Sequence, residues 1–504
     1  MSNSPTAPFP ADSAPRLQRL RRFAVGPQSR AAWLGFLGAL LITVGGLGAG
    51  STRIHDPVLD SLHLSWLRFG HGLVLSSVLL WSGVAVMLAA WLGLGRRVIN
   101  GTVSTYTLIA TTGFWLAPLL LSVPIFSRDT YSYLAQGALL RDGFDPYQVG
   151  PVDNVNALLD NVSPIWAATT APYGPAFILI AKLVTLLVGN NVVAGTMVLR
   201  LCMLPGLVLL IWAAPRVATR VGGSATTALY LAVLNPLVII HLMGGVHNEM
   251  LMVGLLIAGI ALTLERHHLA GMALVALAAA VKATAAIALP FLVWIWMRRL
   301  REARGYSAPV AFAAAVAASG AIVVAVFAVM SSLAGVGMGW LTALLAGNVK
   351  IINWLTVPTA AANLIHAIGG LFFSVNFYAV LHVTRIGGVA LIAVLLPILW
   401  WRARRDDRSA VAGIAWAMLV VVLFVPAALP WYYTWPLAVA ATVVRSPTAI
   451  AAIAAASSWI MVIFKPDGSH GMYDWFQVIA AMGCAAYSWY RLSSAQPAQE
   501  LENA

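Results

Sequence analysis

The sequence predicts an all-α integral membrane protein that crosses the bilayer about twelve times, and three observations support this prediction. Of its 504 residues, 60% are hydrophobic and 9% are charged, which is too little charge for a water-soluble surface. Apolar runs recur along the chain, each about as long as the 20-residue helix that spans 30 Å of hydrocarbon. Basic residues stand mainly at the ends of these runs, as the positive-inside rule requires.

The apolar runs predict the order of the membrane helices. Full spans are expected at Ala31–Gly50, His71–Leu94, Tyr106–Val123, Val192–Ala213, Ala225–Leu242, Pro309–Leu333, Val411–Pro426 and Ile450–Phe464. The run Ala176–Gly189 has only about 14 residues, so we expect a half-span or re-entrant helix there. The run Leu269–Met297 lies between arginines and is interrupted by Lys282, which predicts a helical hairpin that dips into the membrane from the cytosolic side.

Arginine clusters set the orientation of these helices. They lie at residues 16–22, 96–97, 298–304 and 402–408, between or beside predicted spans. The net charge of +13 therefore indicates a cytosolic side, and nucleic acid is not an expected partner. The first span lacks an Ala-x-Ala cleavage site, so we expect an uncleaved helix and a cytosolic N-terminus.

This orientation also predicts the domain organisation. We expect a disordered cytosolic N-terminus at residues 1–30, one transmembrane domain at residues 31–491 and a cytosolic tail at residues 492–504. Residues 124–172 form the longest polar stretch and lie outside by this count. The two cysteines, Cys202 and Cys484, both lie in apolar runs, which excludes a disulfide framework and a cysteine-based metal site.

The few charged residues outside the arginine clusters point to the side that carries chemistry. Ten of the seventeen acidic residues fall on segments predicted to lie outside, among them Asp129 and Glu249. The four lysines are Lys182 and Lys282, in membrane segments, and Lys350 and Lys465, on outer loops. Such cations are costly without an anionic partner, so they contact phospholipid headgroups or capture a lipid-linked phosphate.

One motif joins a charged pair to the end of a span. It runs from Phe126 to Tyr147 and places Arg128 and Asp129 at the boundary between lipid and water. Ser127 or Asp129 can cap a following helix that lies in the interface, because its apolar residues gather on one side. The pattern alone leaves two roles open for Asp129, a helix cap or a reacting carboxylate.

This motif resembles that of the actinobacterial polyprenyl-phosphomannose-dependent α-(1→6)-mannopyranosyltransferases, members of the GT-C class of membrane glycosyltransferases. The resemblance extends from about residue 35 to about residue 490. It includes the motifs at residues 55–57, 66–71, 171–175, 244–249, 350–355, 430–433 and 465–471. Two departures stand out: two additional spans precede the outer loop, and the loop has one acid where other GT-C enzymes have a pair.

The resemblance implies an enzyme that transfers mannose from polyprenyl-phosphate-mannose to the α-(1→6)-mannan backbone of lipomannan and lipoarabinomannan. Asp129 would be the general base of an inverting reaction, and Arg128, Lys350 and Lys465 are candidates to bind the donor phosphate. Candidates to bind the acceptor sugar are His247, Asn248, Glu249, Trp354, Trp431, Tyr432 and His470. Glu249 can instead stabilise the N-terminus of the following helix.

The expected partners follow from this reaction. They are the lipid-linked donor, a lipid-anchored mannan acceptor and membrane lipids, with the active site on the outer face of the plasma membrane. No metal or other cofactor is expected, because a single acid is a poor chelating site. Two alternatives stay open: a transporter or flippase of lipid-linked sugars, which would also need many spans, and a GT-C transferase of another sugar.

Overall fold

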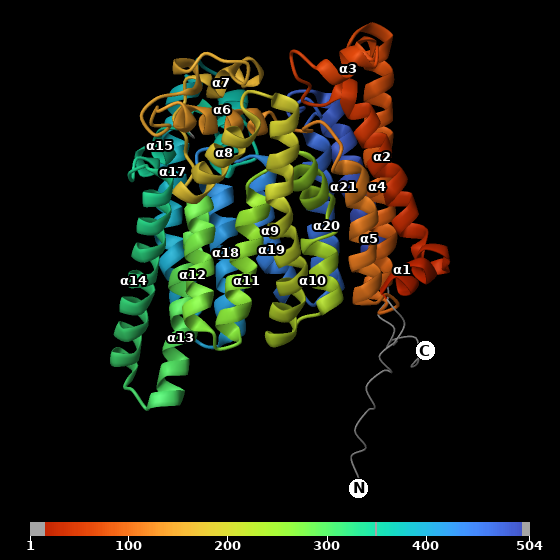
Figure 1. Cartoon of the computed structure of the whole chain (residues 1–504). Coiled ribbons are helices and arrows are strands. Elements are labelled where there is room, and N and C mark those ends of the chain that lie inside the picture. The colour runs from red at the N-terminus through yellow and green to blue at the C-terminus, as the bar shows by residue number, and fades with distance from the viewer. Residues whose placement is uncertain (1–15, 348–349, 496–504) are drawn as a thin grey trace.

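The computed structural model describes residues 16–347 and 350–495, and it confirms an all-α, polytopic fold (Figure 1). Helices pack side by side into a bundle, and shorter helices cover one end of it. We call this the loop end; it holds α3 (Pro57–Ser61), α6 (Asp129–Arg141) and α7 (Pro164–Ala167) (Figure 1). In the described ranges, β pairing is limited to one isolated bridge, between Phe464 and His470.

The N-terminal part of the chain is more ordered than the sequence predicts. Disorder was expected over residues 1–30, but Arg16–Val25 form helix α1 and Pro27–Ser29 form a 3-10 turn. Residues 1–15 lie outside the described residues. Helices α2 (Arg30–Ala49), α4 (Gly70–Ile99) and α5 (Thr105–Leu119) follow, and α2 and α4 pack along their lengths.

The predicted half-span is present as α8 (Pro175–Val188), which stays at the loop end. Its first turn lies beside the end of α12, because the N–H of Gly174 donates to the carbonyl of Val281. The next helix, α9 (Val192–Arg220), then runs through the bundle to the opposite end (Figure 1). Gly137 of α6 lies so close to α8 that a Cβ there would meet the carbonyl oxygen of Ala181 at 2.3 Å.

The middle of the bundle is formed by α9 with the next helices along the chain. These are α10 (Ala225–Ala232), the π-helical η5 (Leu237–Gly244), α11 (Glu249–Leu264), α12 (His268–Val281), η6 (Ala283–Ala288) and α13 (Leu289–Arg304). Helices α10 and η5 meet at an angle of 49°. Helices α9 and α11 touch at Gly206 and Gly254, where a Cβ on Gly254 would lie 2.0 Å from the carbonyl oxygen of Gly206.

The predicted hairpin at residues 269–297 exists, but it is not a shallow dip. Its arms are α12 and the combined run Ala283–Arg304, which at 22 residues is long enough to cross a membrane. Its tip, Lys282, reaches the first residue of α11, Glu249. The expectation of a partial insertion is therefore wrong for the second arm.

The remaining helices complete the bundle. They are α14 (Ala308–Ala334), α15 (Trp340–Gly347), α16 (Val357–Gly369), α17 (Phe377–Arg402), α18 (Asp407–Phe424), α19 (Thr434–Val443), α20 (Pro447–Ile463) and α21 (Trp475–Ser493). Among the described residues, seven helices are long and apolar enough to cross a membrane, or eight if α10 and η5 form one bent span. The expected total of about twelve crossings, which also used shorter helices, stays a prediction.

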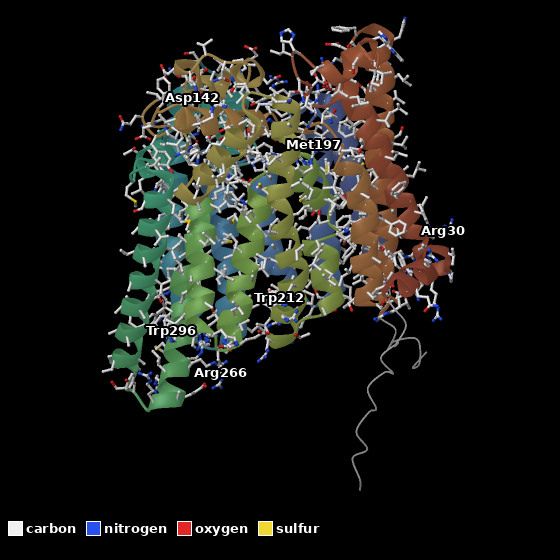
Figure 2. All side chains as sticks on the ribbon, viewed as in Figure 1. Arg30, Asp142, Met197, Trp212, Arg266 and Trp296 are labelled. Atoms are coloured by element: carbon white, nitrogen blue, oxygen red, sulfur yellow. The ribbon has the colours of Figure 1, made fainter. Side chains whose placement is uncertain are left out.

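Arginines gather at the end of the bundle opposite the loop end, as the charge pattern predicts. Figure 2 shows Arg266 at that end and Asp142 at the loop end. Arg298 and Arg299 of α13 both bind Asp407, the first residue of α18, at 2.7 and 2.6 Å. This arginine end therefore joins helices that lie more than a hundred residues apart in the chain.

The helix expected at the membrane interface is buried instead. Helix α6 forms where predicted, but every residue from Asp129 to Leu139 is buried, between α8, α9 and the surrounding loops. The prediction of an interfacial helix is wrong because it assigned the polar side of α6 to water. That side faces cavities inside the protein.

Candidate active site

Asp129 is the first residue of α6, and its carboxyl group lies inside the protein with 8% of the residue exposed. The side chain that accepts a backbone N–H at this helix start is Ser127, whose hydroxyl lies 3.0 Å from the backbone N of Asp129. The carboxyl group is thus free of the capping role that the sequence left open.

Two tight turns present the polar residues of the site. Phe126 has φ of 62° and Val246 has φ of 57°, in the left-handed region that bulky residues avoid. One turn comes three residues before Asp129 and the other three residues before Glu249. Each costs on the order of 1–3 kcal/mol, which surrounding contacts must offset. One such contact is the backbone N–H of Phe126, which donates to the carbonyl of Pro466 at 2.7 Å.

These turns bring four ionisable groups into one continuous cluster. His247 Nδ1 lies 3.8 Å from Asp129 Oδ2 and 3.8 Å from Glu249 Oε2. The other oxygen of Glu249 accepts a hydrogen bond from Lys282 Nζ. The order Asp129, His247, Glu249, Lys282 therefore joins α6, the turn before α11, α11 itself and the tip of the hairpin.

Aromatic rings fix two members of this cluster. The ring of His247 stacks on Trp431 with centroids 3.9 Å apart. Lys282 Nζ lies over three ring faces, at 4.6 Å from Tyr432, 5.3 Å from Trp435 and 5.6 Å from Tyr173. Such cation–π contacts stabilise a buried ammonium together with its carboxylate partner.

Burial changes the acid–base properties of the cluster. It raises the pKa of Asp129 to about 7, and the negative charge of Glu249 adds to the effect while Lys282 opposes it. Burial also lowers the pKa of His247 well below its ordinary value, so this imidazole is neutral at pH 7. The carboxyl group of Asp129 thus exchanges its proton near neutral pH, as a general base must.

Asp129 lies between two cavities, which share Asp129, Trp166 and Leu429 in their walls. The wide cavity, of about 580 Å³, is lined mainly by residues around α7 and by loop residues 350–353, 464 and 467–470. The narrow cavity, of about 60 Å³, is lined by α6, η6 and the residues around Tyr173 and Tyr432. A third, apolar cavity of about 410 Å³ lies between α18, α19 and α20 and includes Tyr433.

The structure brings several predicted residues to these cavities. Arg128, Lys350, Trp431 and His470 line the wide cavity together with Asp129. Lys350 is exposed, and its Nζ donates to Thr169 Oγ1 at 2.9 Å. Tyr432 lines the narrow cavity. His247 and Glu249 are fully buried behind Asp129 and line neither cavity.

Three predicted residues lie elsewhere. Lys465 lines neither cavity and is paired with Asp474, with Nζ 3.4 Å from Oδ2. Trp354 packs near Tyr473 outside both cavities. Asn248 is fully buried, lines neither cavity and does not cap α11 with its side chain.

Arg128 holds two loops of the loop end together. Its Nε and Nη2 donate to the carbonyl of Asn161 at 3.2 and 2.9 Å, and its Nη1 donates to the carbonyl of Thr52 at 3.0 Å. These bonds use three of the five N–H groups of the guanidinium. The remaining N–H groups are what Arg128 can offer to a ligand in the wide cavity.

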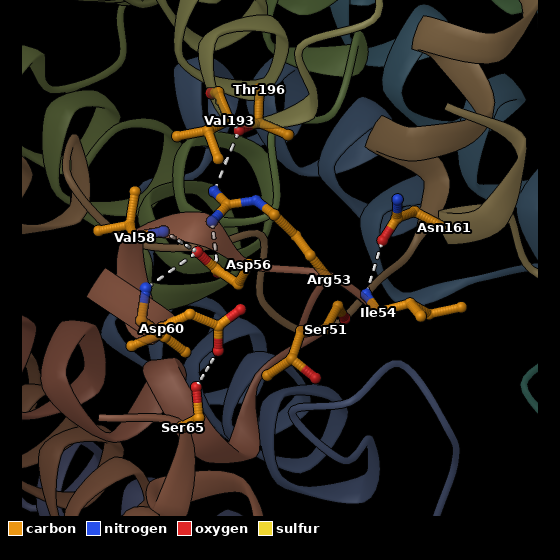
Figure 3. A network of polar contacts seen from close by, with 12 residues as sticks. Ser51, Arg53, Ile54, Asp56, Val58, Asp60, Ser65, Asn161, Val193 and Thr196 are labelled. Carbon is orange, nitrogen blue, oxygen red and sulfur yellow. Dashed lines mark hydrogen bonds and ion pairs between the residues drawn. The ribbon is translucent and has the colours of Figure 1, made fainter. Parts of the chain in front are cut away.

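The segment that Arg128 binds is itself anchored by a buried ion pair (Figure 3). Arg53 Nη1 lies 2.6 Å from Asp56 Oδ2, and Arg53 Nη2 donates to Thr196 Oγ1 of α9 at 3.4 Å. The other oxygen of Asp56 accepts two backbone N–H groups at the start of α3. The backbone N–H of Ile54 donates to the side chain of Asn161 at 2.8 Å, and the carbonyl of Asn161 accepts from Arg128, which lines the wide cavity.

Three site residues were not selected from the sequence. Lys282 was recognised as an intramembrane cation, but its place beside Glu249 depends on the hairpin reaching the loop end. Trp166 of α7 and Tyr173 also line the narrow cavity; Tyr173 lies in the motif at residues 171–175 that carries the resemblance, but that motif alone gave it no role. In the described part of the chain no group of three or more metal-ligating side chains was found.

Comparison with known proteins shows the family of this chain. Residues 32–298 match the family model of the α-(1→6)-mannopyranosyltransferase N-terminal domain, and residues 358–493 match that of the MptB C-terminal domain. An α-(1→6)-mannopyranosyltransferase A from Mycobacterium tuberculosis is 69% identical over 94% of this chain and 92% of its own. The enzyme of the same name from Corynebacterium glutamicum is 37% identical over 88% and 94%. An α-(1→6)-mannopyranosyltransferase B from Corynebacterium glutamicum is 33% identical over 83% and 73%. The chain belongs to the α-(1→6)-mannopyranosyltransferase family.

Proposed function

We propose that this membrane enzyme transfers mannose from polyprenyl-phosphate-mannose to the growing α-(1→6)-mannan backbone of lipomannan and lipoarabinomannan. The observation that carries the proposal is the position of Asp129. Its carboxyl group is buried between two cavities, and its pKa is raised to about 7. The names of the relatives support the sugar and the linkage.

The proposed reaction is a single displacement with inversion at the anomeric carbon. Asp129 takes the proton of the acceptor 6-hydroxyl as its oxygen attacks, and the phosphate leaves from the opposite side. The acceptor mannan lies in the wide cavity, where Trp431 and His470 contact its rings and hydroxyls. His247 and Glu249 act behind Asp129 on its charge and orientation. The mechanism assigns no step to a metal ion.

The proposed orientation puts the loop end outside the plasma membrane and the arginine end in the cytosol. The positive-inside rule supports it, because the arginine clusters gather at one end of the bundle. A lipid-linked donor suits an outer active site, since its sugar is already attached to a membrane anchor. Its polyprenyl chain needs an apolar surface, and the cavity between α18, α19 and α20 offers one within the bundle.

Incubation of membranes with labelled polyprenyl-phosphate-mannose and an α-(1→6)-dimannoside acceptor tests the function. The expected product is an α-(1→6)-trimannoside. A transporter of lipid-linked sugars would move the donor without forming a glycosidic bond, so the absence of trimannoside from well-expressed membranes would favour that alternative. The same assay with other lipid-linked sugars tests for a transferase of another sugar.

The pH dependence of the reaction is a second expected result. Asp129 must be ionised to accept a proton, and its pKa is about 7. The value of kcat/KM is therefore expected to fall about tenfold for each pH unit below 7 and to level off above it. Trimannoside formation between pH 5 and 9 measures this, with samples returned from pH 5 to pH 8 as the control for stability. A rate that stays constant down to pH 5 would remove Asp129 as the base.

The two outer lysines, Lys350 and Lys465, should differ in their effect on donor use, although the sequence predicted the same role for both. Lys350 lines the wide cavity and its Nζ binds Thr169, which lines the narrow cavity, so its charge can reach an anionic donor held between the two. Lys350→Ala is therefore expected to lower kcat/KM for the donor about tenfold. Lys465 is paired with Asp474 outside both cavities, so Lys465→Ala is expected to change it less than twofold. Donor titrations of the two variants check this; equal losses would mean that Lys465 also reaches the donor.

A further inference from the structure

The narrow cavity holds unpaired polar groups that no step above uses. Ser132 and Gln136 are buried residues of α6, and the side-chain oxygen of each lacks a hydrogen-bond partner within the described residues. Thr284 of η6 lines the same cavity, and its hydroxyl also lacks a hydrogen-bond partner within the described residues. Leaving such groups unpaired costs on the order of 1–3 kcal/mol each, unless a ligand binds them.

These groups surround a cation. Lys282 lines the narrow cavity with Ser132, Gln136 and Thr284, and it is buried with 7% exposed. Residues 129, 132 and 136 are three and four apart, so they lie on one side of α6. The narrow cavity is therefore lined by a basic group, two hydroxyls and an amide, with Asp129 also in its wall.

The cavity is too small for a sugar but suits a compact anion. Its volume is about 60 Å³, against about 580 Å³ for the wide cavity on the other side of Asp129. An ammonium and two hydroxyl groups supply N–H and O–H donors, and this is a set that binds a phosphate group. From this arrangement, and resting on the proposed function, we infer that the narrow cavity binds the leaving phosphate of the donor through Lys282.

The two cavities then match the geometry of inversion. The acceptor oxygen approaches the anomeric carbon from the wide cavity, and the bond from that carbon to the phosphate oxygen breaks towards the narrow one. The electrons of that bond remain with the phosphate, and the hydroxyl proton goes to Asp129. Asp129 loses its negative charge as the phosphate gains one, so the net charge of the site is unchanged.

Lys282 can stabilise the negative charge that develops on the leaving phosphate. Its Nζ donates a hydrogen bond to Glu249 and lies over the rings of Tyr432 and Trp435, and Lys282 also lines the narrow cavity. An ammonium has three N–H donors, so it can bind an anion in this cavity as well as Glu249. As charge leaves Asp129, the phosphate becomes the stronger partner of Lys282. The lysine thereby stabilises the transition state more than the bound donor, which is the condition for catalysis.

Binding of farnesyl phosphate to the purified full-length protein, measured by calorimetry, tests the inference without any need for turnover. Farnesol, which has the same chain without the phosphate, is the matched ligand control. Because Lys282→Met alone leaves Glu249 as an unpaired buried charge, the comparison uses Glu249→Gln and the double variant Lys282→Met with Glu249→Gln. Lys182→Met, a lysine of α8 that lines neither cavity, is the control for removal of a membrane lysine.

The double variant is expected to bind farnesyl phosphate at least about tenfold more weakly than Glu249→Gln, the effect of losing one charge-assisted hydrogen bond. Farnesol binding and the Lys182→Met variant should be unchanged. Equal binding of farnesyl phosphate by the double variant and Glu249→Gln would overturn the inference, as would an equal loss for farnesol. A protein that binds farnesyl phosphate through Lys282 but transfers no mannose would contradict the proposed function alone.

Discussion

Asp129→Asn is expected to reduce mannose transfer by about 10² to 10⁴-fold, the usual cost of losing a general base. The amide has the same shape as the carboxyl group but cannot take a proton at neutral pH. The effect should appear in kcat as well as kcat/KM, because the base acts only in the transition state. Formation of labelled trimannoside at equal expression of variant and wild type measures it.

The same variant should be at least as stable as the wild type. Folding raises the pKa of Asp129 from 3.8 to about 7, so the folded state holds the proton more tightly. The stability that this proton contributes is present below pH 3.8 and is lost as the pH rises to about 7. Above that pH the ionised group opposes folding, and asparagine removes this cost. Thermal unfolding of both proteins in detergent at pH 8 checks whether the variant is at least as stable as the wild type.

Acids elsewhere in the loop provide the controls. Asp142 and Asp160 are exposed, and their Asn variants should keep most of the activity. A reduced rate together with a lower unfolding temperature in Asp129→Asn would indicate a structural role. Substantial transfer by Asp129→Asn would remove the proposed base and reopen the transporter alternative.

Arg53→Met is expected to lower the free energy of unfolding by about 3–5 kcal/mol, the range for a buried ion pair that loses one partner. Arg53 and Asp56 are 5% and 1% exposed, so the carboxylate that remains is cut off from water. Its two backbone N–H partners stabilise only part of its charge. Because Arg128 binds this segment, transfer should fall as well. Thermal unfolding of the purified variant measures the first effect.

A less buried pair of the same kind is the matched control. Arg141 and Asp142 lie 2.7 Å apart at the end of α6, with 15% and 33% of their side chains exposed. Arg141→Met is expected to cost about 0–1 kcal/mol, because water replaces the lost partner. Similar losses of stability in both variants would mean that burial does not determine the strength of the Arg53 pair.

The sequence predicts the helical membrane fold and the position of Asp129 well, for separate reasons. Apolar runs show which segments lie in lipid, and arginine clusters show which helix ends lie in the cytosol. Both can be read from neighbouring residues in the chain, without knowledge of distant contacts. Asp129 was found because it begins a polar helix at the end of a span and because its motif resembles a known family. Both signals lie within about twenty residues of each other in the chain.

The rest of the site depends on contacts between distant residues. Glu249 and Lys282 meet only because the hairpin tip reaches the loop end, whereas the flanking arginines and Lys282 predicted a hairpin that dips into the membrane from the cytosolic side. Lys465 was a reasonable phosphate ligand until Asp474, nine residues away, proved to bind it. Helix α6 was assigned to the interface because its sequence cannot show whether water or a closed cavity lies against its polar side.

The contact between Gly206 and Gly254 sets how closely α9 and α11 pack. Backbone lies against backbone there, so any residue larger than glycine at either position would push α9 and α11 apart. Arg200 lies on α9 and Glu249 is the first residue of α11, so the distance between these two buried charges depends on a contact that neither of them makes.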